Sequence, residues 1–122
     1  MATYTLTLGT PSSSKVLVNT DVDETEDEMI LVSSVLQAIE IDNSANSAAT
    51  YVKLGNTTAV NITPGTTHPD WIFLAPAATT TTYLFPIGTT MDAAITVWAV
   101  TAAGTAGATG PTSAVTVRML IQ

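Results

Sequence analysis

The feature that most constrains the fold is a series of short segments in which apolar and β-branched residues recur with a period of two, separated by turn residues. Two such segments close the chain, Ala94–Thr101 and Ser113–Ile121, and the loop Ala102–Thr112 between them contains three glycines and a proline. A period of two places alternate side chains on opposite faces of a pleated strand, which β-branched residues suit. The two segments therefore predict a central β-hairpin.

Segments of the same kind occur earlier in the chain, bounded by Gly, Pro, Asn and Ser. Pro86 either ends the last of them or confines it to the edge of a sheet, because proline lacks the N–H that a central strand donates. The predicted strands are Thr3–Leu8, Lys15–Val18, Ala49–Leu54, Asp70–Leu74 and Thr79–Phe85, with a further short strand within Thr57–Thr63.

Met29–Asp42 fits two periodicities, one with apolar residues at helical spacing and one that alternates as a strand. Its β-branched content and the central Ser33-Ser34 pair favour a strand that is bent or bulged near the serines. About eight strands with no convincing helix are typical of a sandwich, a jelly roll or a barrel. We expect an all-β fold, a jelly-roll-like antiparallel β-sandwich that forms one domain over residues 1–122.

Composition limits the functions that the chain can have. At 122 residues it has the length of one domain, and it contains no cysteine, which excludes disulfides, thiolate metal sites and thiol catalysis. Hydrophobic residues make up 46% and charged residues only 11%, against about 25% charged in an average globular protein. So few charges fit a chain whose surface is largely covered by partners.

The charges are mostly negative, with a net charge of −7 at pH 7. The three cations, Lys15, Lys53 and Arg118, are scattered, whereas nucleic-acid binding needs clustered Lys and Arg. We therefore expect no nucleic-acid partner. No basic segment followed by an apolar run opens the sequence, and no apolar run approaches the ~18–20 residues of a membrane span, so neither a signal peptide nor a membrane segment is expected.

The densest local feature is Asp21–Glu28, in which six of eight residues are acidic. Such a run is most simply an exposed, solvated loop. Closely spaced carboxylates could also supply several of the six to eight oxygen ligands that Ca²⁺ takes, although the glycine and the glutamate spacing of an EF-hand are missing. The candidate calcium ligands are Asp21, Asp23, Glu24, Glu26, Asp27 and Glu28.

Two further polar features are candidates for catalysis. His68 is the only histidine, so it cannot form a His–His metal site, and its position next to Pro69 and Asp70 is typical of a loop residue. Glu40 and Asp42 face the same way on a strand and could act as the carboxylate pair of a glycosidase. No aromatic cleft accompanies that pair, so the sequence indicates no enzyme, no cofactor and no catalytic residue.

The aromatic residues could form a sugar-stacking platform, but in a small β-sandwich they are usually needed for the core. Asn56 and Asn61 match the glycosylation pattern, which means little without a signal peptide. The segment Gly104–Gly110 lacks the lysine of a phosphate loop and is interpreted as a flexible tip or a contact loop. The aromatic residues are Tyr4, Tyr51, Trp71, Phe73, Tyr83, Phe85 and Trp98.

The sequence YVKLGN occurs at Tyr51–Asn56, and GTAGATGPTSAVTVRMLIQ closes a small, acidic, cysteine-free chain rich in Thr, Ala and Gly. By these features the chain resembles tailed-bacteriophage virion accessory proteins. The resemblance lies in Ala49–Asn56 and Thr79–Gln122. Small all-β proteins of that group act as capsid decoration (cement) proteins, or less often as head-fibre or neck components, and they carry no catalytic residues.

The resemblance implies a decoration protein on the capsid surface of a virion, a small homo-oligomer (dimer or trimer) that binds the major capsid protein and reinforces the shell. The main alternative is a fibronectin/immunoglobulin-like or carbohydrate-binding adhesion module. The late segment of the chain is similar to the last strands of a fibronectin-type domain, but Trp71 and Trp98 both come later than the buried tryptophan of that family.

Overall fold

The computed structural model describes residues 14–122, so the predicted strand Thr3–Leu8 lies outside the described part. The described chain contains eight strands and one short 3-10 helix. None of its helices is long and apolar enough to cross a membrane. The elements are β1 (Lys15–Val22), β2 (Asp27–Ile30), β3 (Ser34–Asp42), β4 (Thr50–Gly55), η1 (Ala59–Asn61), β5 (Trp71–Ala75), β6 (Thr80–Met91), β7 (Ile95–Val100) and β8 (Val115–Ile121).

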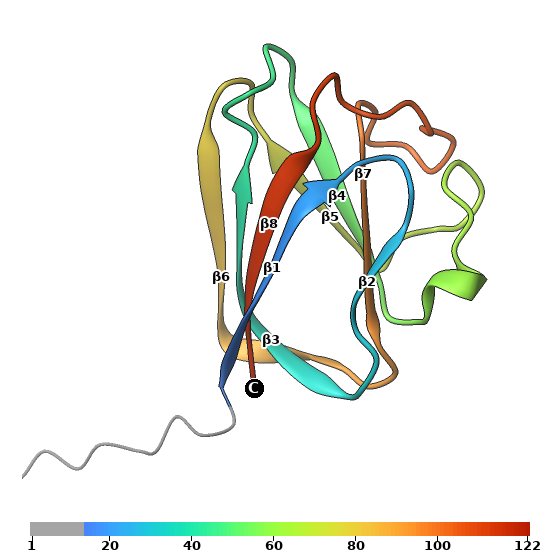
Figure 1. Cartoon of the computed structure of the whole chain (residues 1–122). Coiled ribbons are helices and arrows are strands. Elements are labelled where there is room, and N and C mark those ends of the chain that lie inside the picture. The colour runs from blue at the N-terminus through green and yellow to red at the C-terminus, as the bar shows by residue number, and fades with distance from the viewer. Residues whose placement is uncertain (1–13) are drawn as a thin grey trace, which may run out of the picture.

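The strands form two four-stranded sheets that pack face to face (Figure 1). Sheet A has the strand order β1-β8-β3-β6 and sheet B the order β2-β7-β4-β5. The first half of the chain pairs with the second half in reverse order: β1 with β8, β2 with β7, β3 with β6 and β4 with β5, all antiparallel. This is one long antiparallel hairpin wrapped into two layers, which is a jelly roll. The expected jelly-roll-like sandwich of about eight strands is confirmed.

The predicted C-terminal hairpin is wrong. The strands β7 and β8 form as predicted, and each is internal to a sheet, but they belong to different sheets. Each has two other neighbours: β7 lies between β2 and β4, and β8 lies between β1 and β3. Apart from the hairpin β4–β5, consecutive strands of this jelly roll alternate between the two layers, so the long loop from Thr101 to Ala114 crosses from one sheet to the other and does not form a tight turn.

The strand interpretation of Met29–Asp42 is confirmed, but the segment forms parts of two strands in different sheets and not one bent strand. The chain leaves sheet B after Ile30, bends through residues 31–33 and enters sheet A at Ser34. The register of β3 shifts again between Leu36 and Ala38, opposite a bulge in β6. Pro86 lies within this bulge, and β6 continues past it as the edge strand of sheet A. A proline is tolerated there because an edge strand or bulge does not require its N–H.

Two local predictions need correction. The segment Thr57–Thr63 contains the 3-10 helix η1, not a strand, with the Asn61 N–H donating to the Thr58 carbonyl over 3.1 Å. The acidic run is not one loop: Asp21 lies in β1, which ends at Val22, residues 23–26 form the connection, and Asp27 and Glu28 begin β2.

The main core lies between the two sheets, where inward side chains alternate along every strand. It includes Leu36, Ile41, Val52, Val97 and Met119, each no more than 1% exposed. A second, smaller cluster covers the opposite face of sheet B, where Trp98 and Val100 of β7 pack with Ile62. The loops 56–70 and 101–114 bury that cluster, so sheet B is covered on both faces over part of its area.

Candidate functional site

The outer face of sheet A carries an apolar row that crosses all four strands. Its members are paired in register, Val16 with Leu120, Leu120 with Ala38, and Ala38 with Leu84. Three of them are strongly exposed for their size: Val16 by 65%, Leu84 by 71% and Leu120 by 38%. Exposed large apolar groups that adjoin one another are the surface feature that most often marks a binding site. We call these four residues the apolar row.

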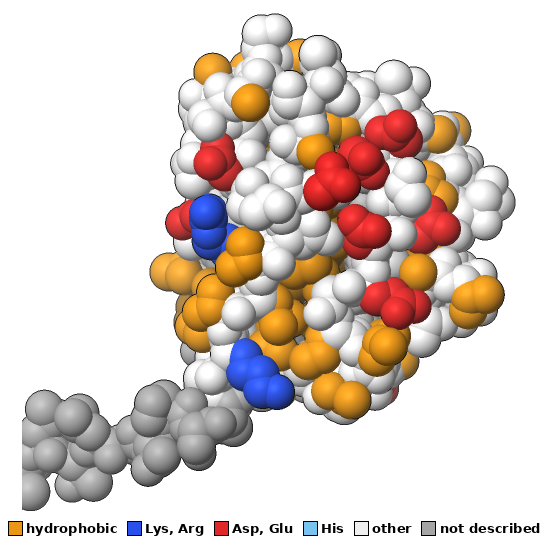
Figure 2. Space-filling view, in the orientation of Figure 1, with side chains coloured by type: hydrophobic (Ala, Val, Ile, Leu, Met, Phe, Trp, Pro, Cys, Tyr) orange, Lys and Arg blue, Asp and Glu red, His pale blue; other side chains and the backbone are white. Residues whose placement is uncertain are grey.

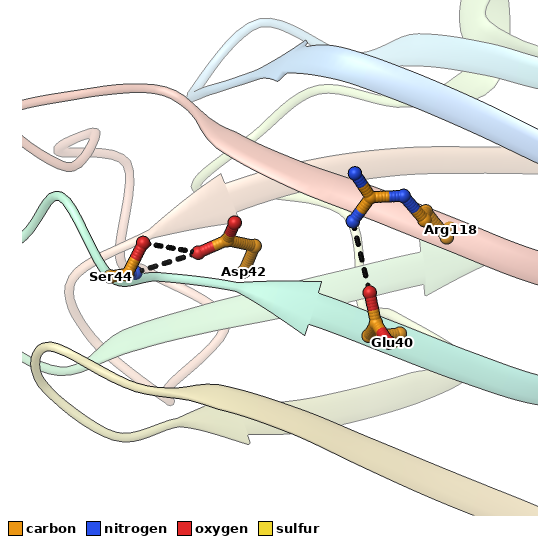
Figure 3. Close-up of polar contacts among 4 residues, drawn as sticks. All are labelled: Glu40, Asp42, Ser44 and Arg118. Carbon is orange, nitrogen blue, oxygen red and sulfur yellow. Dashed lines mark hydrogen bonds and ion pairs between the residues drawn. The ribbon is translucent and has the colours of Figure 1, made fainter.

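A second row lies two residues along each strand and contains the charges of this face. Val18 pairs with Arg118, Arg118 with Glu40, and Glu40 with Thr82. An Nη1 atom of Arg118 lies 2.9 Å from Oε1 of Glu40, with both side chains about two-fifths exposed (Figure 3). Such an exposed ion pair contributes about 0–1 kcal/mol to folding. A shallow hollow of about 250 Å³ lies between the two rows.

The distribution of charge separates this face from the rest of the surface. In Figure 2 orange apolar side chains gather over β1 and β8, with blue cations above and below them, whereas most red side chains lie towards the β1–β2 connection. Lys53, the third cation of the chain, is only 1% exposed. The two cations that reach solvent, Lys15 and Arg118, therefore both belong to strands of sheet A.

Glu40 and Asp42, the candidate carboxylate pair, have separate partners. Glu40 pairs with Arg118, and Asp42 accepts hydrogen bonds from the Ser44 hydroxyl (2.5 Å) and the Ser44 N–H (3.0 Å) (Figure 3). These bonds, the hydroxyl first, lower the pKa of Asp42 below its ordinary value. A glycosidase acid needs a raised pKa. The geometry therefore gives no support to a hydrolytic pair at this position.

Replacing Ser44 with alanine is expected to raise the pKa of Asp42 towards its ordinary value, because the hydroxyl is the largest cause of the lowering. The remaining Ser44 N–H bond keeps the pKa partly lowered. A depressed carboxyl pKa contributes stability that is present above the unfolded-state pKa of about 3.9 and is lost as pH falls through the folded-state pKa, so the variant loses part of that contribution. An NMR titration of the Asp42 carboxyl carbon measures the change. Ser47→Ala, in the same turn, is the control and should leave the pKa unchanged.

The six acidic candidates for calcium do not form a common site. Residues 14–122 contain no group of three or more His, Cys, Asp or Glu side chains that could hold a metal ion. Three of the carboxylates instead accept single hydrogen bonds: Asp23 from the Thr25 N–H (2.9 Å), and Asp27 and Glu28 from other segments. Asp21 and Glu24 are exposed, and Glu26 is partly exposed.

The aromatic residues divide between the core and one edge of the sandwich. Trp98 is fully buried, whereas Trp71 remains 38% exposed at the start of β5. The Trp71 ring meets Phe85 edge-on at 5.2 Å and lies nearly parallel to Phe73 at 6.1 Å between centroids. Tyr83 completes this cluster, 5.3 Å from Phe73. The cluster closes the gap between the edge strands β5 and β6, and so acts mainly as core.

No protein-family model, curated protein or solved structure matches this chain. The evidence for its function therefore lies in its own surface. The strand order does distinguish it from an immunoglobulin-type sandwich, in which the last two strands lie in one sheet.

His68 and the segment Gly104–Gly110, both in loops, make contacts that hold the structure together. His68 is exposed, and its Nδ1 lies 2.9 Å from the Thr105 hydroxyl, which ties together the two loops over sheet B. The Lys53 ammonium donates to the Gly104 carbonyl over 2.6 Å, and burial lowers the pKa of Lys53. Of the two interpretations of Gly104–Gly110, the contact loop fits this arrangement, because that segment covers a buried lysine.

A buried polar cluster at one end of the sandwich was not predicted. Asn43, fully buried, donates to the carbonyls of Ala48, Ala75 and Pro76 over 3.1–3.2 Å. The side-chain carbonyl of Asn43 accepts hydrogen bonds from the Asn46 amide (2.8 Å) and the Thr50 hydroxyl (3.0 Å). Every polar atom of the Asn43 side chain is thus satisfied within the protein. We interpret the cluster as a structural junction between loops, since it has no group left to bind a ligand.

The apolar row was also missed, although the sequence contains a signal for it. The segment Lys15–Val18 has three consecutive apolar residues, so both faces of that strand are apolar. Leu120 likewise stands between two inward residues, Met119 and Ile121, which are buried. A strand with apolar residues on both faces indicates either a covered sheet or a docking surface, and only the register across four strands distinguishes the two.

Proposed function

We propose that this chain is a structural protein of a tailed-phage virion, a capsid decoration protein that binds the major capsid protein at the capsid surface. The observation that carries the proposal is the exposure of large apolar side chains on the outer faces of both sheets. Val16 and Leu84 are exposed on sheet A, and Ile72 and Leu74 of β5 are 44% and 41% exposed on sheet B. A protein that bridges neighbouring subunits needs more than one docking face.

The architecture and the low charge support the same proposal. Jelly rolls are common in viral capsid proteins and lectins, although this is an analogy of fold alone. Several weak contacts made by one rigid oligomer raise the effective concentration of each further contact, which is how a small protein can hold a shell. A head-fibre or neck component would use similar surfaces, and binding to the capsid distinguishes the decoration protein from both.

The acidic connection between β1 and β2 suits electrostatic docking on a basic patch of the shell. Within residues 14–122 the single ion pair is that of Arg118 with Glu40, so none of the six acids in Asp21–Glu28 is neutralised by a neighbour. We expect purified protein to rebind capsids assembled without it, and to bind more weakly as salt rises, because exposed charges are screened. Cosedimentation with those capsids at low and high salt measures this.

Replacing both Glu24 and Glu26 with glutamine should weaken this binding at low salt by at least about threefold, because near-surface charges contribute a few tenths of a kcal/mol to about 1 kcal/mol each. Neither side chain makes a hydrogen bond within the described structure, so folding should be unaffected. The matched control is Asp70→Asn with Asp92→Asn, which removes the same charge elsewhere and keeps oxygen acceptors for Asn56. No binding of the unaltered protein at low salt would contradict the proposed function.

A carbohydrate-binding module is the second candidate, favoured by one observation. The Trp71 ring is partly exposed, rests on other aromatic rings and adjoins Asp70, an arrangement that could stack a sugar. A glycan array probed with the purified protein tests it. Binding that is lost in Trp71→Ala would favour this candidate, and an array without hits would remove it.

A further inference from the structure

We infer that the outer face of sheet A binds a second copy of this chain, as a two-fold dimer in which the two sheets pack face to face with the apolar row at the centre. The inference adds to the proposed function the surface through which copies associate. It rests on that function only in treating the chain as a structural protein.

The order of residues in the apolar row is self-complementary. Across the sheet it runs Val16, Leu120, Ala38, Leu84, in the strand order β1-β8-β3-β6. A two-fold axis parallel to the strands, between β8 and β3, brings β8 of one copy over β3 of the other. Leu120 then meets Ala38, a large side chain against a small one, and Val16 meets Leu84. Large residues placed against small ones let two sheet faces interdigitate.

The same axis makes the charged row complementary. Arg118 lies on β8 and Glu40 on β3, so the axis places each Arg118 opposite Glu40 of the second copy. Each guanidinium, already 2.9 Å from its own Glu40, would gain a second carboxylate without any charge being left unpaired. Isologous contacts require this reciprocity, in which residue i meets j and j meets i.

The net charge of the chain also favours this face. Copies that each carry −7 repel one another over most orientations. The acidic run Asp21–Glu28 spans the β1–β2 connection and the strand ends beside it, whereas Arg118 lies on the outer face of sheet A, in the row next to the apolar row. Two copies that approach through sheet A therefore bring opposite charges together and keep their acidic segments away from the centre of the contact.

The size of the face sets the expected affinity. Four strands about 4.8 Å apart and about 20 Å long span on the order of 400 Å² of sheet, about half of the ~800 Å² that each partner buries in a standard stable interface. The dimer should therefore be weak, with a Kd on the order of 100 µM. It would form readily only where the protein is concentrated, for example on a shell.

Sedimentation equilibrium of the full chain, without capsids, tests the inference. We expect a monomer–dimer equilibrium that Leu120→Lys weakens at least tenfold, because it places a cation at the centre of the row. Leu74→Lys is the matched control: Leu74 is 41% exposed on the outer face of sheet B, against 38% for Leu120, and its substitution should leave the equilibrium unchanged.

Exchanging the charges of Arg118 and Glu40 provides a second test, which leaves the apolar row unchanged. Arg118→Glu alone and Glu40→Arg alone should each weaken the dimer, since each sets like charges opposite one another, and the double variant should restore it. Thermal unfolding of every variant verifies the fold.

A protein that stays monomeric at concentrations on the order of 1 mM, or a dimer that Leu74→Lys disrupts and Leu120→Lys does not, would overturn the inference. Capsid binding is a separate measurement, so either proposal can fail while the other stands.

Discussion

Replacing Asn43 with aspartate is expected to lower the free energy of unfolding by about 3–5 kcal/mol at neutral pH. The substitution keeps the size of the side chain and removes its NH₂ donors. The carbonyls of Ala48, Ala75 and Pro76 would then lose their shared donor and face a second carboxylate oxygen at hydrogen-bonding distance. A buried oxygen pair that repels costs more than a lost contact, because no water can replace the donor.

The pH dependence gives this prediction a second readout. Burial among carbonyls raises the pKa of the new carboxyl above its unfolded value of about 3.9. The folded state then binds more protons than the unfolded state, so stability falls as pH rises between the two pKa values. Urea unfolding followed by circular dichroism should therefore show that the variant loses least in free energy of unfolding, relative to the unaltered protein, near pH 4 and most at neutral pH.

Asn61→Asp is the control for the charge itself. Asn61 is exposed, and its amide donates only to threonine hydroxyls in its own loop. Adding a negative charge there should change stability by less than about 0.5 kcal/mol, as at most surface positions. Equal losses from the two substitutions would mean that net charge, and not the buried hydrogen-bond junction, determines the stability of this end of the sandwich.

The junction around Asn43 also shows what the sequence could predict. The residues Asp42–Ala48 are rich in turn formers, and the chain does turn there. Which of its polar residues is buried depends on two distant loops, those at residues 75–79 and at Ser113, which meet it only after folding. Local composition indicates a turn, but it cannot identify the residue that other segments will surround.

The strands themselves were predictable because each carries its own two-residue period. The two-residue period of β7 puts Trp98 and Val100 opposite Ile95 and Val97, and the two sets do form separate clusters on the two faces of sheet B. The partner of each strand was not predictable in the same way. Proximity in sequence favoured pairing β7 with β8, whereas burial of all six residues of β7 required a neighbour on each side within one sheet and loops over its outer face.

The candidate site was less accessible to sequence reasoning than the fold. The acidic run and the single histidine attract notice because of their residue types, yet the structure gives them separate hydrogen-bond partners. The apolar row consists of ordinary residues, Val16, Ala38, Leu84 and Leu120, spread over four strands. A surface of that kind is created by strand order and register, so it appears only when the topology is known.

Truncating Trp98 to alanine is the other change expected to have a large effect, a loss of about 3–5 kcal/mol in the free energy of unfolding. The Trp98 side chain is fully buried and packs with Val100 and Ile62 on the outer face of sheet B. It is the largest side chain in that cluster. Its removal would leave a cavity beneath the two loops that cover the sheet and would expose the stem of Lys53, its register partner on β4.

Phenylalanine at the same position separates packing from hydrogen bonding. The Trp98 Nε1–H is buried and has no hydrogen-bond partner within residues 14–122. Trp98→Phe loses part of the ring but also removes that unsatisfied donor, which costs about 1–3 kcal/mol when buried, so the two effects should nearly cancel. We expect the free energy of unfolding of Trp98→Phe to lie within about 1.5 kcal/mol of that of the unaltered protein. The free energy of unfolding of Trp98→Ala should lie well below both.

The measurement is urea unfolding of both variants, with the denaturant slope checked for constancy. Trp71→Ala is the comparison at the other tryptophan, and it should cost less than Trp98→Ala because the Trp71 ring is already 38% exposed. A loss of under about 1 kcal/mol for Trp98→Ala would mean that the loops over sheet B contribute little to the fold. The outer face of sheet B around β7 would then have to be treated as open, like the exposed part of the same face at β5.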